Sequence, residues 1–239
     1  MPSEVVLTRT DDRLASLLAA RGATVLTVAC VAIEPADGLQ LAAVLSGLDV
    51  DDMLVLTSPA GVDAVAGAIA LDALRCGIAA VGAVTAARIA THGRTADFIP
   101  THPSGASLAR EMPLPRGEIV LARSDRALAD LPAILRRRGA RVRELVAYRT
   151  VPRAGGDVAS ARRAIARGAT VVFASPSAIE GLLEAIGAVA LRDARVVAIG
   201  ATTADAVRTI VGRAPLVAAV AKPEEAVDVV IGQQRVAHR

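Results

Sequence analysis

Two patterns of apolar and polar positions alternate along the chain. Short runs rich in Val, Ile and Leu, such as "EVVLTR" (4–9) and "DMLVLTS" (52–58), are typical of buried strands. Between them lie stretches with helical spacing, such as "DDRLASLLAARG" (11–22), which ends at glycine. Strands that alternate with helices indicate an α/β protein with parallel sheets. The same patterns predict strands at 23–28, 78–82 and 96–100, a helix from Pro59, and a helix from Thr85 to Gly93.

The second half of the chain repeats the first. "VVLTRTDDRLASLLAARGATV" (5–25) resembles "IVLARSDRALADLPAILRRRGARV" (119–142). "LVLTSPAGV" (54–62) resembles "VVFASPSAI" (171–179), and "AVGAVTA" (80–86) resembles "AIGATTA" (198–204). Three blocks in one order at nearly one spacing predict two similar α/β lobes with parallel sheets.

Two extended segments occupy matching places in the repeats. "VACVAIEP" (28–35) aligns with "VAYRTVP" (146–152), and each ends in proline before a polar loop. We interpret them as two linker strands between the lobes, at 29–36 and 146–151.

Tyr148 lies in the second of these segments and is the chain's only tyrosine, while Val31 takes the matching place in the first. The asymmetry favours a functional phenol on one side of a cleft. It is equally compatible with a boundary tyrosine whose ring packs on the core and whose hydroxyl meets water. The sequence leaves both interpretations open.

Composition narrows the classes of function. Apolar residues make up 53% of the 239 residues, enough for a sizeable core, yet no apolar run approaches the length of a membrane span. The start of the chain lacks the pattern of a secretory signal, so we expect a cytoplasmic protein. Cys30 and Cys76 have no metal-ligand spacing, and the three histidines form no zinc motif, so we expect no metal.

The 27 basic residues nearly balance the 24 acidic ones, and 26 of the basic residues are arginine. The run "RRRGARVR" (136–143) lies at the end of a predicted helix, where the helix dipole favours cations. It has no interleaved aromatic residue on which bases could stack, so we expect no nucleic-acid partner.

Polar residues gather where the predicted strands end, which is where open α/β sheets bind ligands. Ser58 and Ser175 each precede a proline, as helix N-caps do. Free N–H groups at such helix starts also attract anions. The motifs of phosphate loops and of nucleophile–base pairs are absent from the sequence. An enzyme of this kind would position a reactive substrate and exclude water.

Taken together, these blocks resemble the uroporphyrinogen-III synthase family over nearly the whole chain. The resemblance rests on the motifs already quoted and on "AAVGAVTAARIATHG", "ADFIPTHPSGASLAREM", "GEIVLARS", "GARVRELVAYRTVP" and "VAIGATTADAV", in that order. It implies one lobe from residues 1–28 and 152–239, a second from 37–145, and an active-site cleft between them. It also implies cyclisation of the linear tetrapyrrole hydroxymethylbilane with loss of water and inversion of ring D, without a cofactor, by a monomer.

The resemblance also implies roles for residues. Tyr148 matches the family's tyrosine that helps the substrate hydroxyl to leave, and an ordinary tyrosine pKa of about 10 keeps such a phenol protonated at pH 7. The positions that match substrate-binding residues are Arg9, Ser58, Thr85, Arg123, Ser175, Ser177, Arg195, Thr202 and Thr203. The glycine turns depart from the family's G-P-x-T by reading "GAVT" and "GATT", and a common proline of the first linker is missing. The alternative is a non-catalytic two-lobed module that binds or senses a tetrapyrrole or another polyanion.

Overall fold

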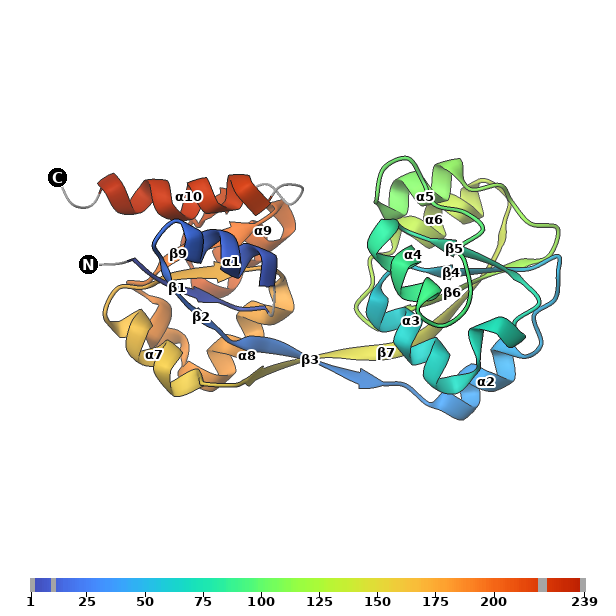
Figure 1. Ribbon diagram of the computed structural model, residues 1–239, viewed down its shortest axis with the longest axis horizontal. Helices are drawn as coiled ribbons and strands as arrows, with labels where there is room; N and C mark the ends of the chain where they lie inside the picture. The colour runs from blue at the N-terminus through green and yellow to red at the C-terminus, as the bar shows by residue number, and fades with distance from the viewer. Residues whose placement is uncertain (1–2, 10–11, 219–222, 237–239) are drawn as a thin grey trace. The chain divides into compact units, whose positions relative to one another are not determined.

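The computed structural model describes residues 3–9, 12–218 and 223–236, and the chain forms two compact units (Figure 1). Unit 1 consists of Met1–Ala32 and Val151–Arg239, and unit 2 of Ile33–Thr150. Both boundaries fall inside the segments that we interpreted as linkers, 29–36 and 146–151. Their role as linkers stays a prediction.

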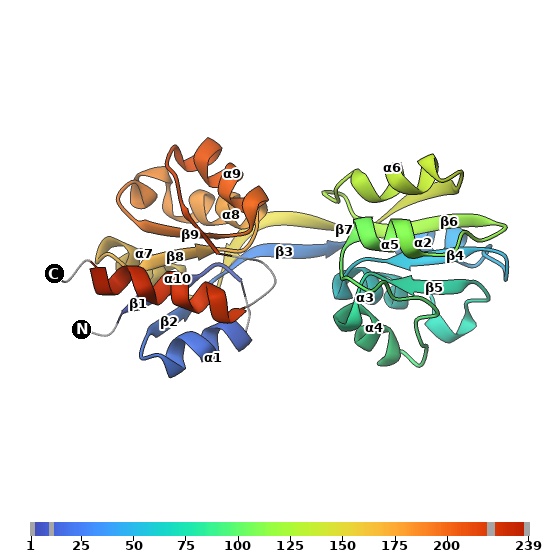
Figure 2. The ribbon, with the colours of Figure 1, turned by 90° about the horizontal axis from the view of Figure 1, so that it is seen from above.

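Unit 1 is built on a parallel sheet with the strand order β10-β9-β8-β1-β2. Helices α1 and α10 pack on one face of this sheet, and α7, α8 and α9 pack on the other (Figure 2). The elements are β1 Glu4–Leu7, α1 Asp12–Ala20, β2 Thr24–Thr27, α7 Val158–Ala166, β8 Thr170–Phe173, α8 Pro176–Ile186, η2 Ala188–Leu191, β9 Arg195–Ile199, α9 Ala201–Val211, β10 Leu216–Ala218 and α10 Pro223–Val236.

Unit 2 is built on a sheet with the strand order β3-β7-β6-β4-β5. Helices α2, α3 and α4 cover one face, and α5 and α6 cover the other. The elements are α2 Gly38–Leu45, β4 Met53–Leu56, α3 Pro59–Ala68, η1 Leu71–Ala73, β5 Gly77–Ala80, α4 Ala83–Ala90, α5 Gly105–Glu111, β6 Glu118–Ser124 and α6 Asp130–Arg137. Strands β3 Ala29–Pro35 and β7 Arg141–Gly155 each cross a unit boundary, and their residues 33–35 and 141–150 belong to unit 2.

Each sheet combines strands from both sequence repeats. Each unit takes the first strands of one repeat and the later strands of the other, so β9-β8-β1-β2 in unit 1 corresponds to β5-β4-β6-β7 in unit 2. The register agrees as well, because Val6 pairs with Val171 while the matching residues Val120 and Leu54 pair with each other. The similarity of the repeats thus extends to strand order and register.

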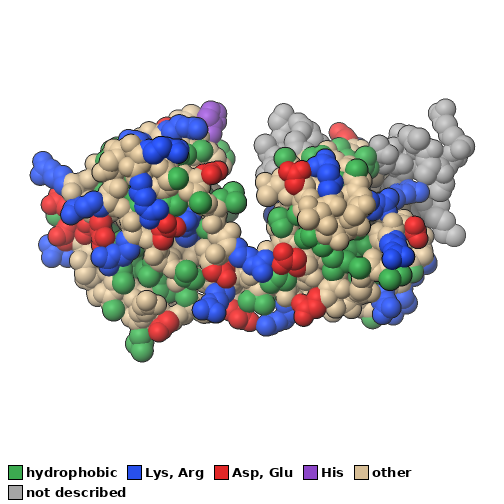
Figure 3. Space-filling view, turned by 180° about the vertical axis from the view of Figure 1, so that it is seen from behind, with side chains coloured by type: hydrophobic (Ala, Val, Ile, Leu, Met, Phe, Trp, Pro, Cys, Tyr) green, Lys and Arg blue, Asp and Glu red, His purple; other side chains and the backbone are tan. Residues whose placement is uncertain are grey.

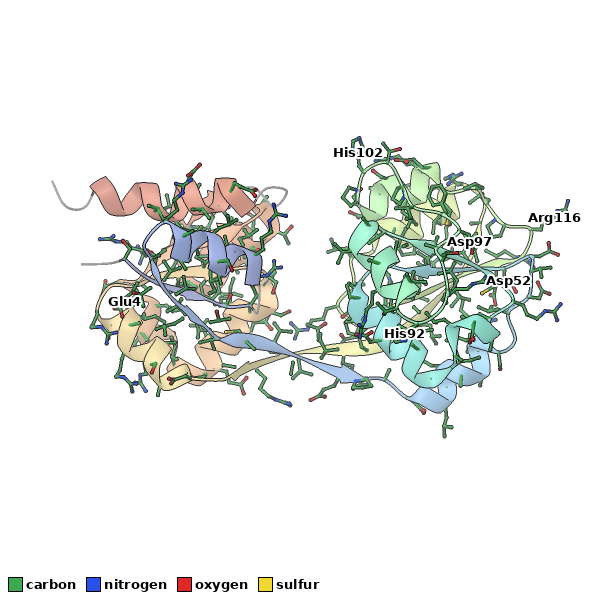
Figure 4. All side chains as sticks on the ribbon, in the orientation of Figure 1. Glu4, Asp52, His92, Asp97, His102 and Arg116 are labelled. Atoms are coloured by element: carbon green, nitrogen blue, oxygen red, sulfur yellow. The ribbon has the colours of Figure 1, made fainter. Side chains whose placement is uncertain are left out.

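One predicted strand is reduced to a single bridge. Residues 96–100 form only an isolated bridge between Phe98 and Ala79. The Asp97 carboxylate accepts the Ile78 N–H at 2.7 Å, so a side chain supplies a bond that a neighbouring strand would otherwise make. Asp52 acts similarly on the Glu118 N–H at 2.7 Å, and Figure 4 labels both aspartates. Helix α4 begins at Ala83, two residues before the predicted Thr85.

Charged side chains of both signs are interspersed over the face shown in Figure 3. None of the helices that the structure describes is long and apolar enough to cross a membrane.

Gly181 allows α8 to pack closely within unit 1. A Cβ atom at this position would lie 2.0 Å from the Cys30 carbonyl oxygen and 2.8 Å from the Arg153 nitrogen. Both neighbours are backbone atoms of β3 and β7, which cannot move aside as a side-chain tip could. Only glycine therefore fits here without displacing a strand.

We expect Gly181→Ala to lower the free energy of unfolding by about 2 kcal/mol or more, because the added methyl group overpacks the backbone. Gly67→Ala is the matched control, since Gly67 also lies inside a helix but has nothing within 4 Å of its Cβ position. That control should gain about 0.5–1 kcal/mol from helix propensity. Urea denaturation measures both changes, and equal stability of the two variants would contradict the close packing.

Candidate active site

The candidate site of unit 2 lies at the carboxyl end of its sheet. Ser58 follows β4, and Ser124 is the last residue of β6. Strands β4 and β6 are parallel neighbours, so the loops after them leave from the same edge. This is the edge at which open α/β sheets bind ligands. Tyr148, in the neighbouring strand β7, pairs with Ser124 at this edge.

A register shift in β7 sets the direction of the Tyr148 ring. Arg123 pairs with Val146, but the next residue, Ser124, pairs with Tyr148, so Ala147 is an extra residue on β7. Successive side chains of a regular strand point to opposite faces. Here Ala147 and Tyr148 both join the core cluster under α2, α3 and α4. Such irregularities re-aim side chains, and this one turns the phenol ring toward α3.

The phenol meets the start of α3 through a hydrogen bond. The Tyr148 hydroxyl lies 2.9 Å from the Ser58 Oγ, and the Tyr148 side chain is almost entirely buried. Ser58 also caps α3, because its Oγ accepts the Gly61 N–H at 3.1 Å. One serine therefore stabilises the helix and also binds the phenol.

Gly61 leaves room for this contact. A Cβ atom there would lie 3.3 Å from the Ala122 carbonyl oxygen, 3.4 Å from the Ser58 Oγ and 3.7 Å from a ring carbon of Tyr148. The first turn of α3 thus sits directly against β6 and the phenol ring. The Tyr148 ring therefore lies beside the first turn of α3, and its hydroxyl meets the Ser58 hydroxyl.

Thr85 and Arg123 are the other predicted binding residues of unit 2, and both are buried. Thr85 is buried in the first turn of α4, which follows β5 at the same edge of the sheet. Arg123 is also buried, and its guanidinium binds the Leu128 carbonyl at 2.7 Å and the Glu144 carboxylate. In the structure, Arg123 therefore holds the loop after β6. Its role in binding substrate stays a prediction.

Glu144 is the partner that keeps Arg123 in place. Burial alone raises the pKa of the Glu144 carboxyl, but hydrogen bonds from Arg123 and Arg136 outweigh burial and hold this pKa below its usual value. The carboxylate is therefore charged at neutral pH and remains a strong partner for both arginines.

Five of the predicted binding residues lie at the corresponding edge of the sheet in unit 1, the carboxyl end of its strands. Ser175 caps α8 by accepting the Ala178 N–H at 3.3 Å, and Ser177 is buried in the same turn. Thr203 is buried and Thr202 is exposed at the start of α9. Arg9 is exposed after β1. The structure brings these residues to the carboxyl end of one sheet.

Arg195 lies apart from that group. It is the first residue of β9, where it pairs with Thr170 at the start of β8, whereas Thr202 and Thr203 follow the end of β9. The length of a strand separates Arg195 from the edge where the other predicted residues gather. Its predicted role is therefore not supported by proximity to them.

Three residues beside Tyr148 were not assigned a role by the sequence analysis. Ser124, Asp125 and Thr150 form hydrogen bonds with one another where β6 ends. The sequence repeat could have pointed to Ser124 and Asp125, because the first repeat reads Arg9-Thr10-Asp11 where the second reads Arg123-Ser124-Asp125. Thr10 and Asp11 lie outside the described residues.

The cysteines and acidic residues offer little alternative chemistry. Burial raises the pKa of the Cys30 thiol to about 12, so this thiol is a poor nucleophile at neutral pH. Among the described residues, no group of three or more His, Cys, Asp or Glu side chains could hold a metal ion. The prediction of a reaction without metal or cofactor stays a prediction. The site offers hydroxyl groups and helix N-termini, which can bind anions and donate hydrogen bonds to a leaving group.

Comparison with known proteins gives the family. The model of the family described as uroporphyrinogen-III synthase HemD matches residues 12–228. No curated protein matches the chain.

Solved structures agree with the fold. A mutant uroporphyrinogen III synthase from the extremely thermophilic bacterium Thermus thermophilus has a TM-score of 0.59 and 23% identity, and the match covers 99% of both chains. A uroporphyrinogen-III synthetase from Helicobacter pylori has a TM-score of 0.65 and 16% identity, over 99% of this chain and 100% of that one. At these identities the likeness concerns the fold, and it confirms the predicted α/β class. Because the family model spans most of the sequence, the chain belongs to the uroporphyrinogen-III synthase family.

Proposed function

We propose that this chain cyclises hydroxymethylbilane to uroporphyrinogen III, with Tyr148 as the residue that acts on the leaving group. The hydrogen bond between the Tyr148 and Ser58 hydroxyls carries the proposal. Membership of the family supports the reaction, and this contact supports the role of the residue. The comparisons do not favour the alternative of a non-catalytic sensor.

The reaction needs help at one bond. The pyrrole nitrogen lone pair expels the hydroxyl of the hydroxymethyl group, the carbon–oxygen bond breaks, and the oxygen leaves as water after taking up a proton. The substituted carbon of ring D then attacks the resulting cation and forms a spiro intermediate. The bond from that carbon to the bridge from ring C breaks, and the bridge bonds to the other α-carbon of ring D, which loses its proton. Ring D is thereby inverted. A hydrogen bond from a neutral phenol to the departing oxygen stabilises the negative charge that develops there.

Ser58 leaves the Tyr148 proton free for this task. A serine hydroxyl has one proton to donate and two lone pairs that accept. One lone pair takes the Gly61 N–H, so the Ser58 proton can be donated to the Tyr148 oxygen. The Tyr148 hydroxyl then donates its own proton to the substrate. Ser58 thus orients the phenol and strengthens it as a donor.

The carboxylates of the substrate require cationic or N–H partners. Helix N-termini at α3, α4, α8 and α9 supply N–H groups, and Thr85 and Thr203 are buried in the first turns of α4 and α9. Arg9 and the hydroxyls of Ser175, Ser177 and Thr202 complete the proposed binding set. We propose that the protein acts as a monomer in the cytoplasm, without nucleic acid or membrane. Sedimentation equilibrium tests the first of these points.

Product analysis tests the function itself. Hydroxymethylbilane is supplied to the purified protein, the products are oxidised to porphyrins, and isomers I and III are separated by chromatography. Isomer I forms spontaneously without inversion of ring D. A product that is mainly isomer III supports the proposal. Isomer I alone, from protein shown to be folded, would indicate a non-catalytic binding module.

Tyr148→Phe removes only the hydroxyl that we assign to the chemistry. We expect kcat to fall by roughly 100-fold, the size of a typical general-acid contribution, with KM little changed. The free energy of unfolding should fall by about 1 kcal/mol, because one hydrogen bond is lost. Steady-state kinetics and urea denaturation measure these quantities, and a wild-type kcat would show that Tyr148 only packs.

Ser58→Ala removes the partner of the phenol together with a helix cap. We expect a loss of about 1 kcal/mol in stability from the cap and a fall in kcat from the misdirected phenol. Ser104→Ala is the matched control, because Ser104 caps α5 in the same unit by accepting the Ser107 N–H at 3.0 Å. The control should lose similar stability and keep its kcat. Equal effects of both variants on kcat would refute the link to Tyr148.

Thr203→Val keeps the volume of a buried side chain and deletes its hydroxyl. We expect KM for hydroxymethylbilane to rise several-fold, because a proposed substrate contact is lost. Thr209→Val in the same helix is the control, since the Thr209 hydroxyl donates to the Asp205 carbonyl at 3.1 Å on the exposed side. An unchanged KM for Thr203→Val would leave Thr203 as a packing residue of α9.

A further inference from the structure

Strand β7 continues past the last residue of β6, and Asp125 takes over as its partner. Strand β6 ends at Ser124, which pairs with Tyr148. The Asp125 N–H then donates to the Tyr148 carbonyl at 3.1 Å. The Asp125 carboxylate accepts the Thr150 N–H at 2.9 Å, where a further strand residue would have offered its carbonyl. Asp125 therefore holds β7 on both sides of Arg149.

Two hydroxyl groups link this contact back to β6. The Ser124 hydroxyl donates to Asp125 at 3.1 Å and lies 2.8 Å from the Thr150 hydroxyl. The Ser124 Oγ also accepts the Arg126 N–H at 3.2 Å. The end of β6, the loop after it and the middle of β7 are thus joined by side chains directly beside the register shift.

Asp125 acts here as a carboxylate. Its hydrogen bond from the Thr150 N–H is the main reason that the pKa of its carboxyl lies below the usual value. An ionised carboxylate accepts hydrogen bonds and donates none, so it suits the N–H and hydroxyl donors around it. Arg123 fixes the same loop from inside through the Leu128 carbonyl.

The placement of this network gives it a consequence for Tyr148. The register shift leaves Ala147 without a pairing partner on β6. In a regular register, the Tyr148 ring would point to the opposite face of the sheet. The contact between the Ser124 and Thr150 hydroxyls needs both side chains on one face of the sheet, which the shifted register provides and a regular register would not. The Asp125 carboxylate accepts hydrogen bonds from the Ser124 hydroxyl and from the Thr150 N–H, so it holds these two residues together in that register. These contacts therefore favour the backbone arrangement that brings the phenol to Ser58.

We propose that Asp125 is a positioning residue, which holds the shifted register of β7 and thereby aims the Tyr148 hydroxyl at its reaction partner. Asp125 itself need not touch the substrate. The kinetic part of this proposal rests on the proposed function of Tyr148, whereas the positioning of the ring does not.

The first test needs no substrate. Because Tyr148 is the only tyrosine, a protein with labelled tyrosine rings gives one set of tyrosine signals in its NMR spectrum. We expect Asp125→Ala to shift or broaden these signals, because the ring loses its fixed place. Asp125→Asn should restore signals close to wild type, since its amide oxygen still accepts the Thr150 N–H. Unchanged signals in Asp125→Ala would overturn the proposal.

A matched control separates positioning from a general loss of stability. Asp157 also accepts a backbone N–H with its carboxylate, from Ser160 at 2.9 Å, but it caps α7 in unit 1. Asp157→Ala should leave the tyrosine signals and kcat as in wild type. Equal changes in both variants would mean that Asp125 has only a structural role.

The second test uses the complete reaction. We expect Asp125→Ala to lower kcat roughly 10-fold, as small misplacements of catalytic groups do, with KM changed less than about twofold. Asp125→Asn should recover most of kcat. A wild-type kcat in Asp125→Ala, or a fall that Asp125→Asn does not relieve, would overturn the kinetic part of the proposal.

Combination with Tyr148→Phe shows whether Asp125 acts through the phenol. If it does, Asp125→Ala lowers kcat in the wild-type background and causes no further fall in the Tyr148→Phe background. Equal falls in both backgrounds would overturn the proposal. Full activity of Tyr148→Phe alone would instead refute the proposed function of the tyrosine, and the NMR comparison would still decide the positioning.

Discussion

Strand β7 pairs with β6 in a register that skips Ala147, and the geometry of the candidate site depends on that skip. A regular strand would place Ala147 and Tyr148 on opposite faces of the sheet. The skip puts both on the side of α3, where the phenol meets the Ser58 hydroxyl. Because Ser58 is also the N-cap of α3, the position of the phenol is coupled to the start of a helix. Gly61 suits the close approach of α3 to β6, since a Cβ atom there would crowd the Ala122 carbonyl oxygen at 3.3 Å.

The internal repeat explains the scaffold but not the chemistry. Corresponding strands of the two units share order and register, and a capping serine precedes a proline at the same place in both. The units differ where β7 carries Tyr148 and the matching segment of the first repeat carries Val31. A duplicated fold thus supplies two similar sheet edges with hydroxyls and helix N-termini, suited to a substrate rich in carboxylates. One of the two repeats adds a phenol, and we propose that this asymmetry gives the molecule its reactive position.

Local patterns in the sequence predicted most of the fold and part of the site. Val/Ile-rich runs gave the strands, and the Ser-Pro pairs gave the caps at Ser58 and Ser175, because both signals are local. The register shift was not predictable, since it depends on which residues of two distant strands face each other. Asp125 was given no role for the same reason: its backbone partners, in Tyr148 and Thr150, are distant in sequence. Arg195 was included because it matched a substrate-binding position of the family, and it lies at the start of β9, at the opposite end of that strand from Thr202 and Thr203.

The most direct test of this account is whether the Tyr148 ring faces α3. A nuclear Overhauser measurement suits it, because every tyrosine cross-peak must come from this one residue. The Cβ position of Gly61 lies 3.7 Å from a ring carbon of Tyr148, so the α protons of Gly61 are near the ring. If the ring faces α3, we expect a cross-peak between the Tyr148 ring protons and the Gly61 α protons. Cross-peaks instead to side chains under α5 and α6, such as Leu108 or Leu135, would place the ring on the other face and contradict it.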